Sequence, residues 1–197
     1  MKNLFIKSII LVVIGNFALL EAASNGHYMG VFMGVSKLNY GKSSTSAIEV
    51  PTDNIKVKAN FKMLEYGYTF KDKYSIQLNY QILSQDDLYI SNYTLGVHYS
   101  LYKLKRVDFH TGVYGGYSEL TWVNTLFPTT KKELKSTSYV VGADLGIEFG
   151  ITHQLWITLL YKYAHYGHET NLKIGQLNST LKHQDSNSIL AGFKFVF

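Results

Sequence analysis

Apolar and polar residues alternate along much of the chain with a period of two. The clearest stretch is 74–83, and the same alternation recurs over 93–101 and 139–149. In the first stretch the apolar positions are Tyr74, Ile76, Leu78, Tyr80 and Ile82. A period of two predicts a β-strand with one apolar and one polar face. Charged residues occur on only one of the two faces.

Five less regular segments complete the pattern, at 28–38, 59–70, 107–121, 155–166 and 187–197. Together with the first three they predict eight strands. An even number returns both chain ends to the same side of a closed barrel, as single-chain bacterial barrels require. We therefore predict an all-β fold, an eight-stranded antiparallel up-and-down transmembrane β-barrel.

The segments between these strands alternate in length. Short ones are expected at 71–73, 102–106 and 150–154, and longer ones at 41–57, 122–137 and 167–186, with a short exception at 84–89. Short periplasmic turns and longer outer loops are typical of outer-membrane barrels. A soluble lipocalin-like barrel or a β-sandwich would also show alternating strands, so the direction of the apolar face must decide between them.

Aromatic residues favour the membrane alternative. They gather on the apolar face near both ends of the predicted strands, separated by Leu, Ile and Val. The expected lower girdle is Phe70, Tyr74, Tyr99, Phe109, Phe149 and Phe197, and the upper girdle is Tyr93, Tyr117, Tyr139 and Tyr163. Two such girdles mark the interfaces of a membrane barrel. Trp156 does not fit this parity, so its direction stays open.

The first residues predict a secretory signal peptide. Lys2 and Lys7 precede an apolar stretch at 9–20, and small residues follow at Ala22 and Ala23. This order is the n-region, h-region and cleavage site of a signal. The apolar stretch is shorter than the roughly twenty residues that a spanning helix needs. We expect a cleaved signal peptide at 1–23 and the barrel at 24–197.

Composition narrows the function classes. The chain of 197 residues suits a single domain, and 46% hydrophobic residues with 2 Pro exclude a disordered or proline-rich chain. With 0 Cys, disulfide scaffolds and cysteine chemistry are excluded. The net charge of +5 includes the leader, and no Lys/Arg tract favours nucleic acid.

The last residues alternate aromatic side chains and end on phenylalanine. Gly192, Phe193, Phe195 and Phe197 carry this pattern, which resembles the terminal signature that outer-membrane proteins present to the barrel-assembly machinery. Leu190 stands where that signature usually has a polar residue. With the leader and the strand count, the chain resembles the small OmpA/OmpX-type, porin-like outer-membrane barrels. The resemblance implies a cell outer membrane location in a Gram-negative bacterium and assembly by that machinery.

Some barrels of this size deacylate lipid A, and His98 and Ser100 have the spacing of their His-x-Ser pair. By parity, however, both side chains face the lumen near the periplasmic end, whereas the family's pair meets lipid. We assign no catalytic residue. His165, His168 and His183 flank the last outer loop, but their spacing fixes no zinc geometry, so no metal and no cofactor are expected.

The polar face predicts an ion network inside the barrel. Its expected members are Glu65, Asp108, Asp144, Glu148, Lys162 and Lys194, with His98 and His110 beside them. Eight strands leave an interior just wide enough for side chains, and buried charges persist when they are paired. We therefore expect a plugged lumen.

Lysines in or near the outer loops are candidates for contact with lipopolysaccharide phosphates: Lys42, Lys56, Lys58, Lys131, Lys132, Lys135, Lys173 and Lys182. An ordinary solvated surface explains them equally well. The sequence thus predicts a non-enzymatic, monomeric structural protein of the outer membrane in contact with lipid and lipopolysaccharide. A narrow pore and a lipid A-modifying enzyme remain the alternatives.

Overall fold

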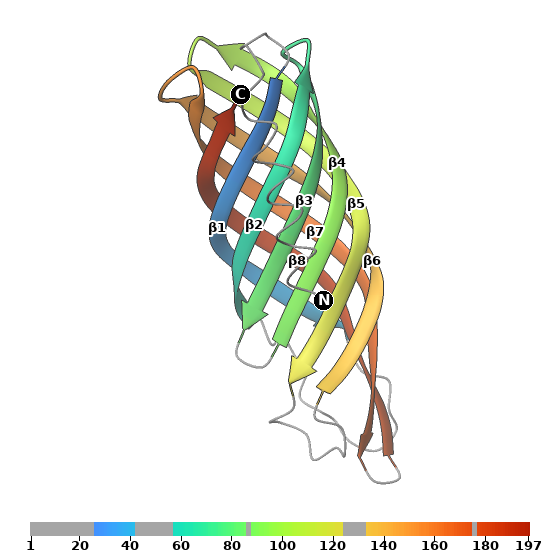
Figure 1. Ribbon diagram of the computed structural model, residues 1–197. Coiled ribbons are helices and arrows are strands. Elements are labelled where there is room, and N and C mark those ends of the chain that lie inside the picture. Colours follow the sequence, from blue (N-terminus) through green and yellow to red (C-terminus); the bar gives the residue numbers. More distant parts are fainter. Residues whose placement is uncertain (1–25, 42–56, 86–87, 124–132, 175–176) are drawn as a thin grey trace, which may run out of the picture.

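The computed structural model describes residues 26–41, 57–85, 88–123, 133–174 and 177–197. These residues form eight strands: β1 (Gly26–Gly41), β2 (Val57–Phe70), β3 (Tyr74–Gln85), β4 (Leu88–Leu104), β5 (Val107–Val123), β6 (Glu133–Gly150), β7 (Leu155–Ile174) and β8 (Leu177–Val196). Each strand pairs antiparallel with the next, and β8 pairs with β1 to close the barrel (Figure 1). The predicted fold is confirmed.

Three tight connections lie at one end of the barrel, which we call the turn end (top of Figure 1). Between β2 and β3, Lys71 and Asp72 both have positive φ, 49° and 57°, and Lys73 N donates to Phe70 O over 3.1 Å. Two successive residues of positive φ match the right-handed twist of the strands that they join. The opposite end, where the two longest connections (42–56 and 124–132) join the strands, is the loop end.

The strands extend further toward the loop end than the sequence pattern predicts. β6 begins at Glu133, and β7 and β8 remain paired as far as Ile174 and Leu177. The long loop expected at 167–186 is therefore largely strand, and that prediction was wrong. Backbone hydrogen bonds form a ladder whether or not one face is apolar, so the hairpin continues where the alternation stops. A register shift between His165 and His168 marks the change.

Within the described residues, no helix is long and apolar enough to cross a membrane.

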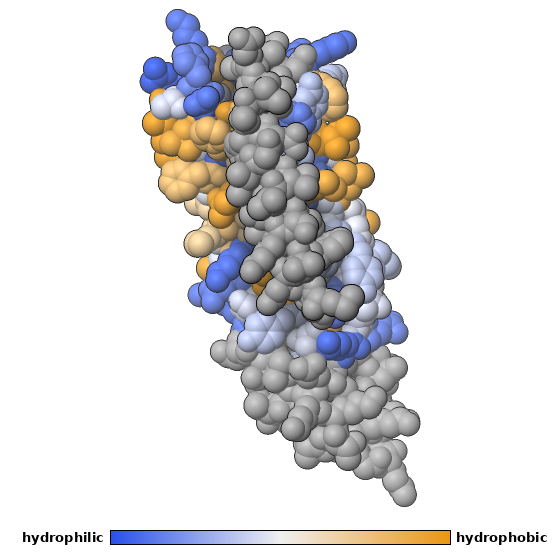
Figure 2. All heavy atoms as spheres, in the orientation of Figure 1, coloured by the Kyte–Doolittle hydropathy of each residue, from blue (hydrophilic) through white to orange (hydrophobic). Residues whose placement is uncertain are grey.

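The outer surface carries an apolar band with hydrophilic residues on either side of it, visible on both flanks of the face drawn in Figure 2. Exposed Leu, Ile, Val and Met side chains form its middle, among them Leu78, Leu95, Val113, Leu145 and Leu159. Aromatic residues border the band at both ends. The exposed members of the predicted girdles are Phe70, Tyr74, Tyr99, Phe109 and Phe149 near the turn end, and Tyr93, Tyr117, Tyr139 and Tyr163 toward the loop end. A closed barrel with this outer surface requires a bilayer around it.

The interior is filled by side chains whose character changes along the barrel axis. Toward the loop end the inward positions hold a packed apolar cluster together with neutral polar side chains such as Gln81, Asn92 and Ser118. The cluster includes Phe32, Leu38, Ala59, Phe61, Met63, Leu83, Leu88, Ile90 and Leu120. Toward the turn end the inward positions are polar or charged. Strand β2 shows the change within one strand, because inward Phe61 and Met63 are followed by inward Glu65. The core thus lies inside the barrel, in two chemically different halves.

Candidate functional site

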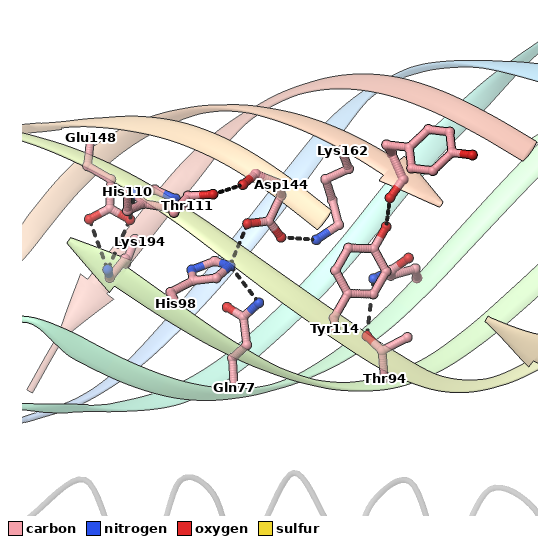
Figure 3. A network of polar contacts seen from close by, with 12 residues as sticks. Gln77, Thr94, His98, His110, Thr111, Tyr114, Asp144, Glu148, Lys162 and Lys194 are labelled. Carbon is pink, nitrogen blue, oxygen red and sulfur yellow. Dashed lines mark hydrogen bonds and ion pairs between the residues drawn. The ribbon is translucent and has the colours of Figure 1, made fainter. Parts of the chain in front are cut away.

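An ion pair lies buried across the middle of the lumen. Lys162 on β7 donates from Nζ to Asp144 Oδ2 on β6 over 2.7 Å, and the two side chains are 1% and 0% exposed (Figure 3). The strand register sets these residues directly opposite each other. Lys162 Nζ also lies 4.0 Å from the centroid of the Tyr114 ring, which adds a cation–π contact. The Lys162–Asp144 ion pair and the Tyr114 ring together occupy the centre of the barrel.

A second ion pair lies nearer the turn end. Lys194 Nζ on β8 contacts both carboxylate oxygens of Glu148 on β6, at 3.0 and 2.9 Å. The same ammonium lies 4.2 Å from the centroid of the Tyr28 ring. His110 Nδ1 is 3.9 Å from Glu148 Oε1. Side chains from β1, β5, β6 and β8 therefore meet around one carboxylate.

Two histidines connect these ion pairs. The rings of His98 on β4 and His110 on β5 stack with their centroids 4.9 Å apart. His98 Nε2 lies 2.9 Å from Asp144 Oδ1 and 2.8 Å from Gln77 Nε2 (Figure 3). Both rings sit over glycines, because a Cβ on Gly112 would overlap His98 and one on Gly146 would overlap His110. The polar half is consequently a packed assembly that links β3, β4, β5 and β6.

The turn end opens into a cavity of about 360 Å³ whose lining residues are mostly polar or charged. The turn residues Lys73 and His153 line its mouth, and the buried His98 and His110 line its inner end. Trp156 lines it as well, which answers the open question of the direction of this side chain. Asp144 and Lys162 are not among the lining residues, so the cavity ends before the central ion pair.

The expected lumen residues differ in how they are held. Asp144, Glu148, Lys162 and Lys194 form the two ion pairs described above. Glu65 is buried, at 3% exposure, beside the Tyr28 hydroxyl. Asp108 is half-buried at the turn end and accepts a hydrogen bond of 2.6 Å from Ser100 Oγ. Each of the two lysines contacts one carboxylate group.

The His-x-Ser pair faces the lumen. Ser100 bonds Asp108, while His98 contacts Gln77 and Asp144. Both side chains therefore have other partners inside the barrel, away from the lipid-facing surface.

The histidines near the last hairpin separate into two environments. His165 faces outward and contacts Asp185 over 2.8 Å. His168 and His183 face inward with ring centroids 6.4 Å apart, and His168 Nε2 lies 2.8 Å from Ser118 Oγ. Among the described residues, no three His, Asp or Glu side chains come together as a metal site.

The C-terminal residues lie at the seam between β8 and β1. Phe193 and Phe195 are exposed to the outside, and Phe197 N donates to His27 O over 2.9 Å. Gly192 lies where a Cβ would overlap the Phe32 ring and the Val31 carbonyl. The close approach of Phe32 across the seam therefore explains why this position of the signature is a glycine.

Sequence reasoning missed the neutral residues that complete the site. Gln77, Tyr28 and Tyr114 occupy inward positions of the alternation, but nothing in the sequence distinguishes them from other lumen residues. The glycines opposite the two histidines were also missed. Their signal is positional, because Gly112 and Gly146 fall on the lumen face of strands that otherwise carry large side chains there.

No protein-family model matches the chain. No curated protein matches it either. Solved structures do. The crystal structure of Neisserial surface protein A (NspA) is 15% identical, with a TM-score of 0.63, over 90% of this chain and 100% of that one. The outer membrane protein OprG from Pseudomonas aeruginosa is 14% identical, with a TM-score of 0.60, over 87% of this chain and 96% of that one.

The chain has the fold of the eight-stranded outer-membrane β-barrels. The structure of the outer membrane protein AlkL in lipid bilayers is a further match. It is 12% identical, with a TM-score of 0.58, over 92% of this chain and 95% of that one. The apolar band and the two aromatic girdles of the present chain form the surface of an outer-membrane barrel, as the sequence predicted. The signal peptide predicted at 1–23 lies outside the described residues.

Proposed function

We propose that this protein is a non-conducting, non-enzymatic barrel of the outer membrane that carries its loop-end strands and loops at the cell surface. In this arrangement the turns lie in the periplasm. The barrel is monomeric, is assembled by the barrel-assembly machinery and has outer-membrane lipids and lipopolysaccharide as its neighbours. The two longest connections, 42–56 and 124–132, both lie between strands at the loop end, which supports this orientation.

The observation that carries the proposal is the ion pair of Asp144 and Lys162 in the middle of the lumen. A conducting pore needs a continuous path of water, but these two side chains are almost fully inaccessible to solvent. Beyond them toward the loop end, the inward positions hold the packed apolar cluster around Phe61 and Ile90. An ion entering the cavity at the turn end would have to displace the ion pair and then cross apolar side chains, which is costly.

The environment of the His-x-Ser pair argues against the lipid A-modifying alternative. A lipid substrate lies outside the barrel, whereas His98 is 7% exposed and turned toward Asp144 inside it. An acyl-transfer site needs its nucleophile and base to converge on the substrate.

The proposal is tested by solute permeation. Purified protein is refolded into liposomes, and the entry of small sugars and amino acids is measured by osmotic swelling. We expect swelling rates equal to those of protein-free liposomes, with a general porin as the positive control. Entry of these solutes at a rate that rises with the amount of protein would refute the plug and favour the narrow pore.

A further inference from the structure

Three lysines gather on the outer surface of β1 and β2 near the loop end. Lys37 and Lys58 are register partners, and both are exposed on the outside of the barrel. Lys62 lies on the same face of β2, also exposed. Like charges placed directly opposite each other on neighbouring strands destabilise a sheet. Lys58 and Lys62 therefore bring two ammonium groups to the same part of the outer surface.

A shallow polar hollow adjoins these lysines. It has a volume of about 300 Å³ and is lined by Lys58, Asn60, Ser84, Gln85 and Tyr89. Asn60, Ser84 and Tyr89 are register partners across β2, β3 and β4, so they form one row on the outer surface. An amide, an alcohol and a phenol thus offer hydrogen-bond donors next to the ammonium of Lys58.

The position of the hollow relative to the membrane is defined by the aromatic girdle. Leu64, Tyr80 and Tyr93 are register partners on β2, β3 and β4 and face outward, and the two tyrosine rings are 4.9 Å apart. Lys62 is two residues closer to the loop end than Leu64. Interfacial tyrosines lie at the level of the lipid headgroups, so the lysines lie at that level or just beyond it.

The acidic residues described near the loop end do not pair with Lys58 or Lys62. Glu169 pairs with Lys182 at 2.7 Å, and Asp185 pairs with His165 at 2.8 Å, both on β7 and β8. Glu119 faces outward on β5, three strands from Lys62. Lys58 and Lys62 form no ion pair with any residue of the described ranges. Of the other loop lysines considered from the sequence, Lys42, Lys56, Lys131 and Lys132 lie outside those ranges.

We propose that the surface formed by Lys58, Lys62 and the adjoining hollow binds a phosphate group of lipid A, the phosphorylated glycolipid of the outer leaflet. The two ammonium groups supply charge-assisted hydrogen bonds to the phosphate oxygens, and the row of Asn60, Ser84 and Tyr89 supplies neutral donors. The acyl chains then extend along the apolar band beside Leu64. The proposal uses the orientation proposed above, with the loop end outside the cell, but it does not depend on the plug.

The test compares two lipids and three double variants. Purified barrel in detergent is titrated with lipid A that carries both phosphates and with the same lipid after enzymatic removal of both. The first variant is Lys58→Gln with Lys62→Gln. The matched control is Lys73→Gln with Lys105→Gln, which removes the same charge from exposed positions at the turn end.

We expect the wild type to bind phosphorylated lipid A about tenfold more tightly than the dephosphorylated lipid. A lysine near an anionic lipid surface contributes enough for the Lys58/Lys62 variant to lose roughly ten- to thirtyfold in affinity for phosphorylated lipid A. The control should change it less than about twofold, and Lys58→Arg with Lys62→Arg should retain binding because the charges remain. Heat-dependent gel mobility verifies that every variant is folded.

Equal losses in the two glutamine variants would overturn the proposal, as would equal affinity of the wild type for the two lipids. Inorganic phosphate at millimolar concentration provides a further arm. If it displaces phosphorylated lipid A completely, the surface recognises free phosphate, and the assignment to lipid A is wrong.

Discussion

Removing the ammonium of Lys162 is the change to which the folded barrel should be most sensitive. In Lys162→Met, the Asp144 carboxylate loses its contact at 2.7 Å and remains in a place where its side chain is 0% exposed. Breaking a buried ion pair by removing one partner costs about 3–5 kcal/mol, because the remaining charge is uncompensated. In the variant, a His98 tautomer that carries its proton on Nε2 can donate to Asp144 Oδ1 across the 2.9 Å between them, so we expect the lower end, about 3 kcal/mol.

The matched control is Lys103→Met. Lys103 pairs with Asp72 at 3.7 Å at the turn end, but both side chains are about half exposed, at 43% and 51%. Exposed pairs contribute about 0–1 kcal/mol. A second comparison is Asp144→Asn with Lys162→Met, in which no buried charge is left alone. It should recover much of the stability that the single variant loses.

The assay is equilibrium unfolding in urea of barrels refolded into lipid vesicles, followed by tryptophan fluorescence and by gel mobility without boiling. A loss of about 3 kcal/mol corresponds to a midpoint lower by on the order of 1–2 M urea. Equal midpoints for Lys162→Met and Lys103→Met would refute the reasoning, because they would mean that Asp144 is hydrated and the lumen is wet.

Three further predictions concern the packing of the two histidines, the C-terminal residue and the location of the barrel. Gly112→Ala and Gly146→Ala should each lower stability by a few kcal/mol in the urea assay, because the new Cβ overlaps the stacked His98 and His110 rings. The control Gly115→Ala, whose Cβ would have its nearest neighbours at 3.7 Å, should leave the urea midpoint of the wild type unchanged. Deletion of Phe197 should sharply lower the amount of assembled barrel in membranes, measured by immunoblot of unboiled samples; wild-type amounts would show that the resemblance to the terminal signature is misleading. The wild type should fractionate with outer membranes and change its gel mobility on boiling, and recovery in the soluble periplasm would contradict the membrane assignment.

The direction of most side chains could be predicted from the sequence, since a period of two holds through the part of each strand that crosses the bilayer. Asp144 and Lys162 were assigned to the lumen on that basis alone. Their pairing could not be predicted in the same way. It depends on the register between β6 and β7, and alternation within a strand carries no information on its offset from the next strand.

The loop-end extension of β7 and β8 was missed for a related reason. Alternation reports the contrast between lipid and lumen, and this contrast ends where the strands leave the bilayer. Residues such as Glu169 and Lys182 pair across the hairpin, although their sequence is typical of a loop. The glycines that make room for the His98 and His110 rings could not be recognised from the sequence either. A glycine that accommodates a ring on a neighbouring strand is identified only when the register of both strands is known.

The central claim is that the lumen is closed by its own side chains, and single-channel recording tests it most directly. Purified monomeric wild type is inserted into a planar bilayer, with insertion verified by protease accessibility and a general porin recorded under the same conditions. The account predicts a current that stays at the level of the bare bilayer across the applied voltages. Stable, reproducible channel openings from the wild-type monomer would contradict it and would make the narrow pore the better description.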